Sequence, residues 1–267
     1  MRVVTANLQH GHPVAGGADS HGPLAAALAP LDGDVVALQE VDVGQSRSGR
    51  IDQAAVAAGA LGTRWWRFAA EFAGQERGVR RRAVPSHVPG RPGYGVALLS
   101  RWPVVSWHVR PLRPGPTRWP ALRAAGWQQH LRYPRLDPPR TVLAAVVDGP
   151  AGRVTVACTH LSVDRPTARR QLAEAAWALR TLPGPHLLVG DLNLEADDVA
   201  AVTGMTPLAR VDTFTAARPR RQLDHVLSSP GLCASGPPVT TRLAISDHLA
   251  LAVDVVGQES HGGPRRR

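Results

Sequence analysis

The sequence predicts a layered α/β domain, and three observations support this prediction. Short β-like runs alternate with helical patterns along the 267 residues. Many of these runs are continuously apolar, which is typical of strands that are covered on both faces. The helical segments between them can supply that cover, and no change in composition marks a linker. We therefore expect a single domain over residues 1–257, followed by a basic, disordered tail over residues 258–267.

The first half of the chain reads as short strands that are interrupted by two alanine-rich helices. β-Branched and aromatic residues favour strands, and turn-forming residues bound each run. Pro30 and Gly62 mark the ends of the two helices. The expected strands are residues 2–6, 34–38, 65–72, 94–99 and 104–109, and the expected helices are residues 24–29 and 52–61.

A longer helix is expected over residues 166–182, where Leu172, Ala176 and Leu179 recur at helical spacing. Pro166 suits the first helical turn, and the Pro-Gly-Pro segment 183–185 ends the helix. The remaining apolar runs predict further strands around this helix and after it. They cover residues 122–127, 141–147, 153–158, 186–189, 222–227 and 248–255.

Polar side chains occur where several expected strands end, and each of them alone is an ordinary turn residue. The six places are Asn7, Gln39-Glu40, Thr159-His160, Asp191 with Asn193, Asp224, and Asp247-His248. Ligand sites in layered α/β folds gather where strand ends and loops converge. We therefore expect these six places to form one polar site, with Leu192 pointing away from it into the core.

The residue types at these places fit one chemical task. Glu40, Asp247 and Asn7 offer hard oxygen ligands, which suit Mg²⁺ or Mn²⁺. Asp224 and His248 can form a carboxylate–imidazole pair in which the carboxylate fixes the tautomer of the ring. A metal ion offsets the charge of a phosphate, and a positioned base activates water. This combination suits the hydrolysis of a phosphate ester.

The charge of the chain leaves two explanations open. The net charge is +10, and every one of the 31 basic residues is arginine. Such a balance fits an anionic partner such as nucleic acid, phospholipid or a phosphorylated small molecule. It also fits a compositional bias toward arginine. Two basic, Pro/Gly-rich stretches, residues 73–92 and 110–120, are expected to be loops that either contact substrate or are solvated.

The sequence also bears on location. No apolar run is long enough to span a bilayer, and no amphipathic basic helix suits a membrane surface, so no stable membrane association is expected. The N-terminus lacks the pattern of a secretory signal, and two cysteines make no disulfide framework or zinc pattern. We therefore expect a cytoplasmic monomer.

At these motifs the chain resembles the endonuclease/exonuclease/phosphatase superfamily of metal-dependent phosphoesterases. The matching segments occur in the family's order between residues 5 and 251. They are TANLQHG, VVALQEV, YGVALLSRWPV, ACTHLS, LLVGDLN, TFTAARPRRQLDHVL and ISDHLAL. The resemblance implies a four-layer α/β sandwich, in which two mixed β-sheets pack face to face with helices outside.

The resemblance also implies a metal centre. Glu40 would be the principal metal carboxylate, with Asn7 and Asp247 close to the same ion, which would be Mg²⁺ or Mn²⁺. One segment departs from the family, because many relatives carry an acidic-Pro-Arg segment where this chain reads Thr-Arg-Trp-Pro at 117–120. The substrate-binding arginine is then expected to be Arg118 or Arg123.

Five further residues receive catalytic roles from the resemblance. Asp191 would orient or deprotonate the attacking water, and Asn193 would bind the phosphoryl oxygens. His160 would donate to the phosphate, and His248, paired with Asp224, would act as a base or as a transition-state donor. If two metal ions act, the residues that contact the second ion would be Asp191, Asn193 and His248.

The function expected from the sequence is therefore divalent-metal-dependent hydrolysis of a phosphodiester, with nucleic acid, DNA or RNA, as the favoured substrate. Hydrolysis of a small phosphorylated molecule or of a phospholipid is the first alternative. A catalytically inert anion-binding protein on the same fold is the second alternative, because a fold alone does not fix a function.

Overall fold

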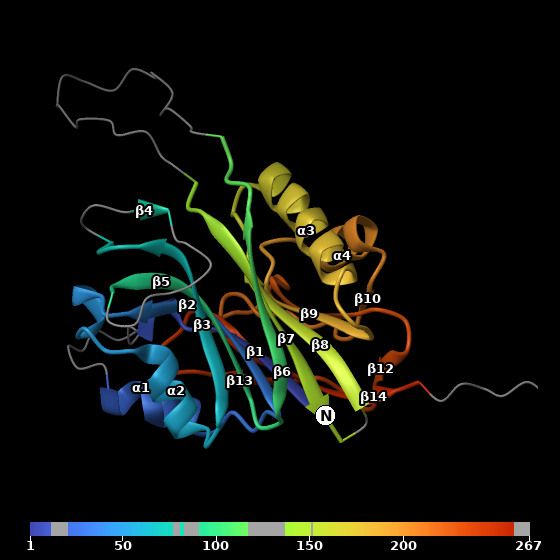
Figure 1. Ribbon diagram of the computed structural model, residues 1–267, viewed down its shortest axis with the longest axis horizontal. Coiled ribbons are helices and arrows are strands. Elements are labelled where there is room, and N and C mark those ends of the chain that lie inside the picture. The colour runs from blue at the N-terminus through green and yellow to red at the C-terminus, as the bar shows by residue number, and fades with distance from the viewer. Residues whose placement is uncertain (12–20, 77–80, 83–90, 117–136, 151, 259–267) are drawn as a thin grey trace, which may run out of the picture.

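Two β-sheets lie face to face in the computed structural model of the protein, and helices cover their outer sides (Figure 1). The structure describes residues 1–11, 21–76, 81–82, 91–116, 137–150 and 152–258. The layers are helices, sheet, sheet and helices, which confirms the expected four-layer α/β sandwich.

The first sheet is mixed and contains the N-terminal and C-terminal strands of the domain side by side. Its order is β12-β14-β1-β2-β5-β3-β4, with β13 paired to β14. β1 runs parallel to β2 and antiparallel to β14. The strands are β1 (Arg2–Asn7), β2 (Val35–Val43), β3 (Trp65–Ala73), β4 (Arg81–Arg82), β5 (Gly93–Ser100), β12 (Leu232–Ala234), β13 (Val239–Arg242) and β14 (Leu249–Gly257).

The second sheet has the order β10-β11-β9-β8-β7-β6. β8 and β9 are parallel, and the other neighbours are antiparallel. A parallel pair requires a crossover connection, which α3 supplies between β8 and β9. The strands are β6 (Val104–Leu112), β7 (Arg140–Gly149), β8 (Gly152–His160), β9 (His186–Asp191), β10 (Thr206–Pro207) and β11 (Asp224–Ser228).

The helices pair off on the two outer faces. α1 (His21–Leu28) and α2 (Gln53–Ala60) cover the first sheet, and α3 (Arg165–Arg180) and α4 (Ala196–Thr203) cover the second. Two short 3₁₀ helices, η1 (Gln9–Gly11) and η2 (Ser46–Ser48), follow β1 and β2. Pro166 lies in the first turn of α3, as predicted, and the Asp164 side chain accepts a hydrogen bond from the Thr167 amide there.

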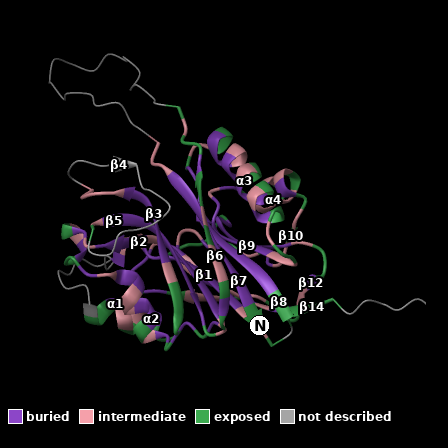
Figure 2. Cartoon of the chain, in the orientation of Figure 1, coloured by how far each residue is buried: buried purple, intermediate pink, exposed green. Residues whose placement is uncertain are grey.

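The apolar runs of the sequence are explained by burial on both faces of each sheet (Figure 2). Along β2, Val35 and Ala37 pack against the opposite sheet, whereas Val36 and Leu38 pack against α1 and α2. Continuous apolar strands are expected wherever neither face meets water. No helix in the described ranges is long and apolar enough to cross a membrane.

Several element boundaries differ from those predicted. The strand that was expected to end at Leu38 continues to Val43, because a β-bulge absorbs residues 39–40 and pairing resumes at Val41. Residues 110–112 belong to β6 rather than to a loop. The expected strand 122–127, loop residues 77–80, 83–90 and 117–120, and tail residues 259–267 lie outside the described residues.

Candidate active site

Three polar residues of the second sheet stand in one row across adjacent strands. His160 is the last residue of β8, Asp191 is the last residue of β9, and Asp224 is the first residue of β11. In the strand registers, Asp191 is the partner of both His160 and Asp224. The sheet therefore brings these three side chains together at the edge where the strands end, as the sequence predicted.

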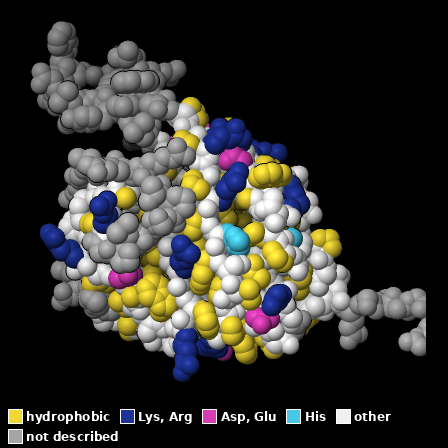
Figure 3. Space-filling model, in the orientation of Figure 1, with side chains coloured by type: hydrophobic (Ala, Val, Ile, Leu, Met, Phe, Trp, Pro, Cys, Tyr) yellow, Lys and Arg dark blue, Asp and Glu magenta, His cyan; other side chains and the backbone are white. Residues whose placement is uncertain are grey.

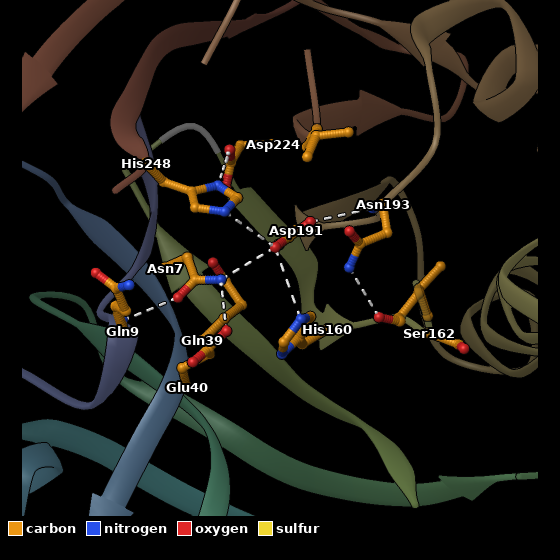
Figure 4. A network of polar contacts seen from close by, with 12 residues as sticks. Asn7, Gln9, Gln39, Glu40, His160, Ser162, Asp191, Asn193, Asp224 and His248 are labelled. Atoms are coloured by element: carbon orange, nitrogen blue, oxygen red, sulfur yellow. Dashed lines mark hydrogen bonds and ion pairs between the residues drawn. The ribbon is translucent and has the colours of Figure 1, made fainter. Parts of the chain in front are cut away.

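The first sheet contributes residues from the opposite side. Asn7 ends β1 beside Gln39, and Glu40 lies in the bulge of β2 with φ of 54°. His248 immediately precedes β14, and its amide donates to Ser246 Oγ at 3.0 Å. Asn7, Glu40 and His248 therefore approach the row of the second sheet from the facing sheet (Figure 4).

The amide of Asn7 joins the two halves of the site. Its Nδ2 donates to Asp191 Oδ2 at 3.0 Å and to Glu40 Oε1 at 3.2 Å. Asn7 and Asp191 are each 2 % exposed, so these contacts are shielded from water. A side chain of β1 thereby fixes the distance between the carboxylates of the two sheets.

Asp224 and His248 form the predicted carboxylate–imidazole pair. His248 Nδ1 lies 2.9 Å from Asp224 Oδ2, and the Asp224 side chain is fully buried. Burial alone would lower the pKa of His248, but the hydrogen bond and charge of Asp224, with the charge of Asp191, raise that pKa to about 9. The ring is therefore charged near neutral pH.

Asp191 lies at the centre of the cluster. Its Oδ2 is 3.7 Å from His248 Nε2 and 3.6 Å from His160 Nε2. Burial, together with the charge of Asp224, raises the pKa of Asp191 to about 7, although His248 and the Asn7 amide oppose that shift. Ligand atoms of Asp191, Asp224 and His248 all lie within 4.8 Å of one another.

Asn193 reaches the site through the predicted turn. The φ of Asn193 is 51°. Its backbone amide donates to Asp191 Oδ1 at 3.1 Å, and its side-chain Nδ2 donates to the Leu161 carbonyl at 3.0 Å. Leu192 is fully buried in the core between the second sheet and its helices, which confirms the prediction that it points away from the site. Asp191 and Asn193 therefore share one site although they flank an apolar residue.

Asp247 is the predicted metal residue with the weakest connection to the cluster. Its backbone amide donates to Gln9 Oε1 at 3.1 Å, and its carbonyl accepts a hydrogen bond from Ala216. Within the described ranges, no hydrogen bond or ion pair joins its carboxylate to Asn7 or Glu40. The structure thus brings Asn7 and Glu40 together and leaves Asp247 beside them, next to His248.

A buried pair that the sequence reading missed supports His160. Arg140, the first residue of β7, has Nη1 2.8 Å from His160 Nδ1 and 3.3 Å from Glu71 Oε2. Burial, and then the charge of Arg140, holds the pKa of His160 well below its ordinary value, so the ring is neutral. Burial raises the pKa of Glu71 to about 8 despite the opposing charge of Arg140.

The expected substrate arginines, Arg118 and Arg123, lie outside the described residues. Two signals in the sequence indicate the missed pair. Glu71 interrupts the apolar run of β3, and a buried carboxylate requires a partner. Arg140 opens the strand β7, which pairs with the strand that ends at His160.

Comparison with known proteins places the chain among related sequences and structures. A family model described as "Endonuclease/Exonuclease/phosphatase family" matches residues 4–248. A search of curated protein sequences finds no match to this chain.

Solved structures of low sequence identity share the fold. An endonuclease/exonuclease/phosphatase from Beutenbergia cavernae is 23 % identical with a TM-score of 0.68, covering 96 % of this chain and 71 % of its own. A family protein from Bacteroides thetaiotaomicron is 16 % identical with a TM-score of 0.65, covering 97 % of this chain and 98 % of its own. A mannosyl-6-phosphatase from the same organism is 16 % identical with a TM-score of 0.59, covering 96 % and 99 % respectively. The match of the family model over nearly the whole chain, on this four-layer fold, shows that the chain belongs to the endonuclease/exonuclease/phosphatase family.

Proposed function

We propose that the protein is a divalent-metal-dependent phosphoesterase that hydrolyses a phosphodiester, with nucleic acid as the favoured substrate. The observation that supports this most is the meeting of Asp191, Asp224 and His248 within 4.8 Å of one another. The Asn7 amide ties Asp191 to Glu40 on the facing sheet. Six strand ends and bends from two sheets thereby present carboxylate, amide and imidazole groups to one place.

The donor set fits a hard divalent cation. Glu40 and Asp191 offer carboxylate oxygens, which are ligands that Mg²⁺ and Mn²⁺ prefer. Asn7 Nδ2 faces both carboxylates while its Oδ1 accepts from the Gln9 backbone amide, so the side-chain amide of Asn7 would have to turn to present its oxygen to an ion. Glu40 and Asn7 would hold the ion, with Asp191 facing them from the second sheet. When bound, the cation offsets the negative charge of the phosphate group.

The protonation states of two residues suit acid–base catalysis, in which one residue accepts a proton from the attacking water and the other donates a proton to the leaving group. Asp191, with a pKa of about 7, can accept the proton of the attacking water as the new P–O bond forms. His248, with a pKa of about 9, is charged and can donate its Nε2 proton to the leaving oxygen as the old P–O bond breaks. Of the two roles that the sequence left open for His248, the charged ring favours the donor.

Two further groups suit the phosphoryl oxygens. If Arg140 donates to His160 Nδ1, the neutral ring keeps its proton on Nε2, which faces Asp191 at 3.6 Å. Asn193 Nδ2 carries a second hydrogen besides the one bonded to Leu161. These donors would stabilise the charge that develops on the phosphate in the transition state.

The proposal is tested by assaying hydrolysis of bis(p-nitrophenyl) phosphate with Mg²⁺ or Mn²⁺. Asp191→Asn and His248→Gln should each lower kcat roughly 10²-fold or more, because each removes a proton-transfer group. His108→Gln, which changes an exposed histidine on β6, should leave the rate unchanged. Activity that survives EDTA or both active-site substitutions would contradict the proposal. Absence of divalent-ion binding in a calorimetric titration would favour the inert anion-binding alternative.

A groove between β6 and α3 carries arginine side chains that favour a polyanionic substrate. Arg110, Arg113, Arg170 and Trp177 line this groove of about 500 Å³. Glu174 also lines it and pairs with Arg113 and Arg170, so the three arginines leave a net positive charge there. The guanidinium of Arg110 lies 5.4 Å from the centre of the Trp177 ring, and Trp177 is 54 % exposed. Figure 3 shows more arginine than acidic side chains on this face. Exposed arginine and tryptophan side chains suit phosphates and stacked bases of a nucleic-acid strand.

A small phosphomonoester is the second candidate, because one structural relative is a mannosyl-6-phosphatase. Parallel assays with p-nitrophenyl phosphate, a sugar phosphate and single-stranded DNA separate the two candidates. A higher kcat/KM on the sugar phosphate than on DNA would overturn the preference for nucleic acid while leaving the metal-dependent hydrolysis in place.

A further inference from the structure

Three consecutive residues after β1 have the left-handed backbone conformation. In η1, φ is 46° at Gln9, 62° at His10 and 73° at Gly11. Glu40, on the neighbouring strand, also has a positive φ of 54°. Such conformations are unfavourable for residues with a side chain and persist only where the surrounding structure enforces them. Their concentration around Glu40 indicates that this turn serves the site.

Two polar contacts hold the turn from its own side. The backbone amide of Gln9 donates to Asn7 Oδ1 at 3.0 Å. The side chain of Gln53, the buried first residue of α2, donates through Nε2 to the His10 carbonyl at 2.6 Å. Gln53 Oε1 in turn accepts a hydrogen bond from the Asp42 amide at 2.8 Å, just past the bulge of β2. The same glutamine therefore ties the turn of His10 to the strand of Glu40.

A further contact holds the turn from the segment that precedes β14. Gln9 Oε1 accepts a hydrogen bond from the backbone amide of Asp247 at 3.1 Å, so the first residue of the turn is fixed to the segment that carries His248. Gly11 has a φ of 73°, which disfavours any residue with a side chain, and a Cβ there would lie 2.7 Å from Gln53 Nε2, so the glutamine would have to shift. The turn is therefore held on both sides of His10.

The turn places the His10 ring against the carboxylate of Glu40. His10 Nε2 lies 3.3 Å from Glu40 Oε2, while the other carboxylate oxygen lies 3.2 Å from Asn7 Nδ2. The two side chains are 23 % and 20 % exposed, so both remain accessible to an ion from solvent. The imidazole nitrogen of His10, in η1, and the carboxylate of Glu40, in β2, thus form one compact pair of possible ligands, with the Asn7 side chain beside them.

We propose that His10 is an additional ligand of the divalent cation that Glu40 holds, so that the site has a mixed nitrogen and oxygen donor set. This inference rests on the proposed function, which makes Glu40 a metal carboxylate. Two neighbouring ligand atoms on a six-coordinate ion, each about 2.1 Å from it, lie about 3 Å apart. The separation of 3.3 Å between His10 Nε2 and Glu40 Oε2 matches that requirement.

An imidazole ligand has a consequence for the choice of metal. Mg²⁺ prefers oxygen ligands, whereas imidazole binds transition metals better. His10 therefore biases the site toward Mn²⁺ over Mg²⁺. Loss of His10 should weaken binding of Mn²⁺ much more than binding of Mg²⁺.

The test uses His10→Asn, because asparagine tolerates the left-handed conformation of residue 10 and is too short to reach the same position. His108→Asn, at an exposed histidine of β6, is the matched control. Metal-free wild-type and variant proteins are titrated with Mn²⁺ and with Mg²⁺ by calorimetry. His10→Asn should raise the Kd for Mn²⁺ by at least about tenfold and that for Mg²⁺ much less.

Pulsed electron paramagnetic resonance at one equivalent of Mn²⁺ then shows whether an imidazole nitrogen is bound. Wild type and His108→Asn should show ¹⁴N coupling, and His10→Asn should lose it. Coupling that persists in His10→Asn, or that disappears only in His248→Asn, overturns the inference. An equal loss of affinity for both ions also overturns it, because a hydrogen-bonding partner of Glu40 would not select between them. If the wild type binds neither ion, the proposed function itself fails.

Discussion

His248 shows how two buried carboxylates set the charge of one ring. The pair with Asp224 is 2.9 Å long, and Asp191 lies 3.7 Å from the other ring nitrogen. Burial of the ring favours its neutral form, yet the two negative neighbours outweigh that effect. The same contacts that prepare His248 to donate a proton therefore also link folding stability to pH.

Stability should respond to pH through His248. The pKa of the ring is about 9 in the folded protein and near 6.5 in the unfolded chain. Its contribution to folding is then full below pH 6.5 and is lost as pH rises through about 9. In metal-free buffer, the free energy of unfolding of wild type relative to His248→Gln should fall by roughly 1–3 kcal/mol between pH 6 and pH 9.5. Urea titrations measure this difference, and a difference that stays constant over that range would contradict the assigned pKa.

The buried pair of Glu71 and Arg140 provides a second prediction for single residues. At pH 9, above the pKa of about 8 of Glu71, Arg140→Met leaves the carboxylate of Glu71 without its partner in the interior, which should cost about 3 kcal/mol or more of unfolding free energy. The double variant Glu71→Gln/Arg140→Met should be less destabilised than the sum of the single variants, because neither charge remains buried alone. Thermal or urea unfolding of the four proteins closes this cycle. Strictly additive effects would show that the two side chains do not interact.

At the scale of elements, the site depends on where strands end and bend. Most of the strands, and the row of His160, Asp191 and Asp224, follow from apolar runs that end in polar residues. The bulge of β2 does not, because a bulge leaves the apolar pattern almost intact and shows only in the register, which changes between Leu38 and Val41. Arg140 could not be predicted either, because its role depends on contacts with His160 in β8 and Glu71 in β3, which its own segment of sequence does not show.

The helix α4 was not predicted for a related reason. It spans only Ala196–Thr203, and its acidic first turn continues the polar run that follows Asn193. Two features of the sequence could have indicated this helix. Asp197 and Asp198 lie in its first turn, and Gly204 follows its last turn, where the structure gives that glycine a φ of 67°. A short amphipathic helix gains most of its stability from packing, which the local sequence does not reveal.

The close approach of β8 and β9 gives a prediction at this scale. Gly190 has φ of 145°, and a Cβ there would lie 1.9 Å from the Thr159 carbonyl oxygen. Gly190→Ala should therefore separate the two strands, lower the free energy of unfolding by at least about 3 kcal/mol and reduce activity by displacing Asp191. Gly59→Ala, at an exposed and open position of α2, should instead stabilise the protein by about 0.5–1 kcal/mol. Urea unfolding and phosphoesterase assays of both variants check the contrast, and equal stabilities would refute the steric argument.

At the scale of the whole molecule, neither sheet can form the site alone. Asn7, Glu40 and His248 come from the first sheet, and the row centred on Asp191 comes from the second. The sequence could indicate this meeting only through the order of its motifs and their family resemblance. Composition and hydrophobic pattern predict layers, but they do not fix which strand edges face each other across a sandwich.

The net charge of +10 gives the last prediction, because the salt dependence of binding distinguishes a polyanionic substrate from a small one. If arginine side chains neutralise about six phosphates, the Kd for a DNA duplex or single strand should rise roughly 10³-fold between 50 and 200 mM salt. Fluorescence anisotropy in EDTA measures this binding without metal-dependent cleavage. Over the same range, the kcat/KM for bis(p-nitrophenyl) phosphate, with its single phosphate, should change far less. Equal and weak salt dependence of both would show that the arginine content reflects composition, and the site would then act on small phosphate esters.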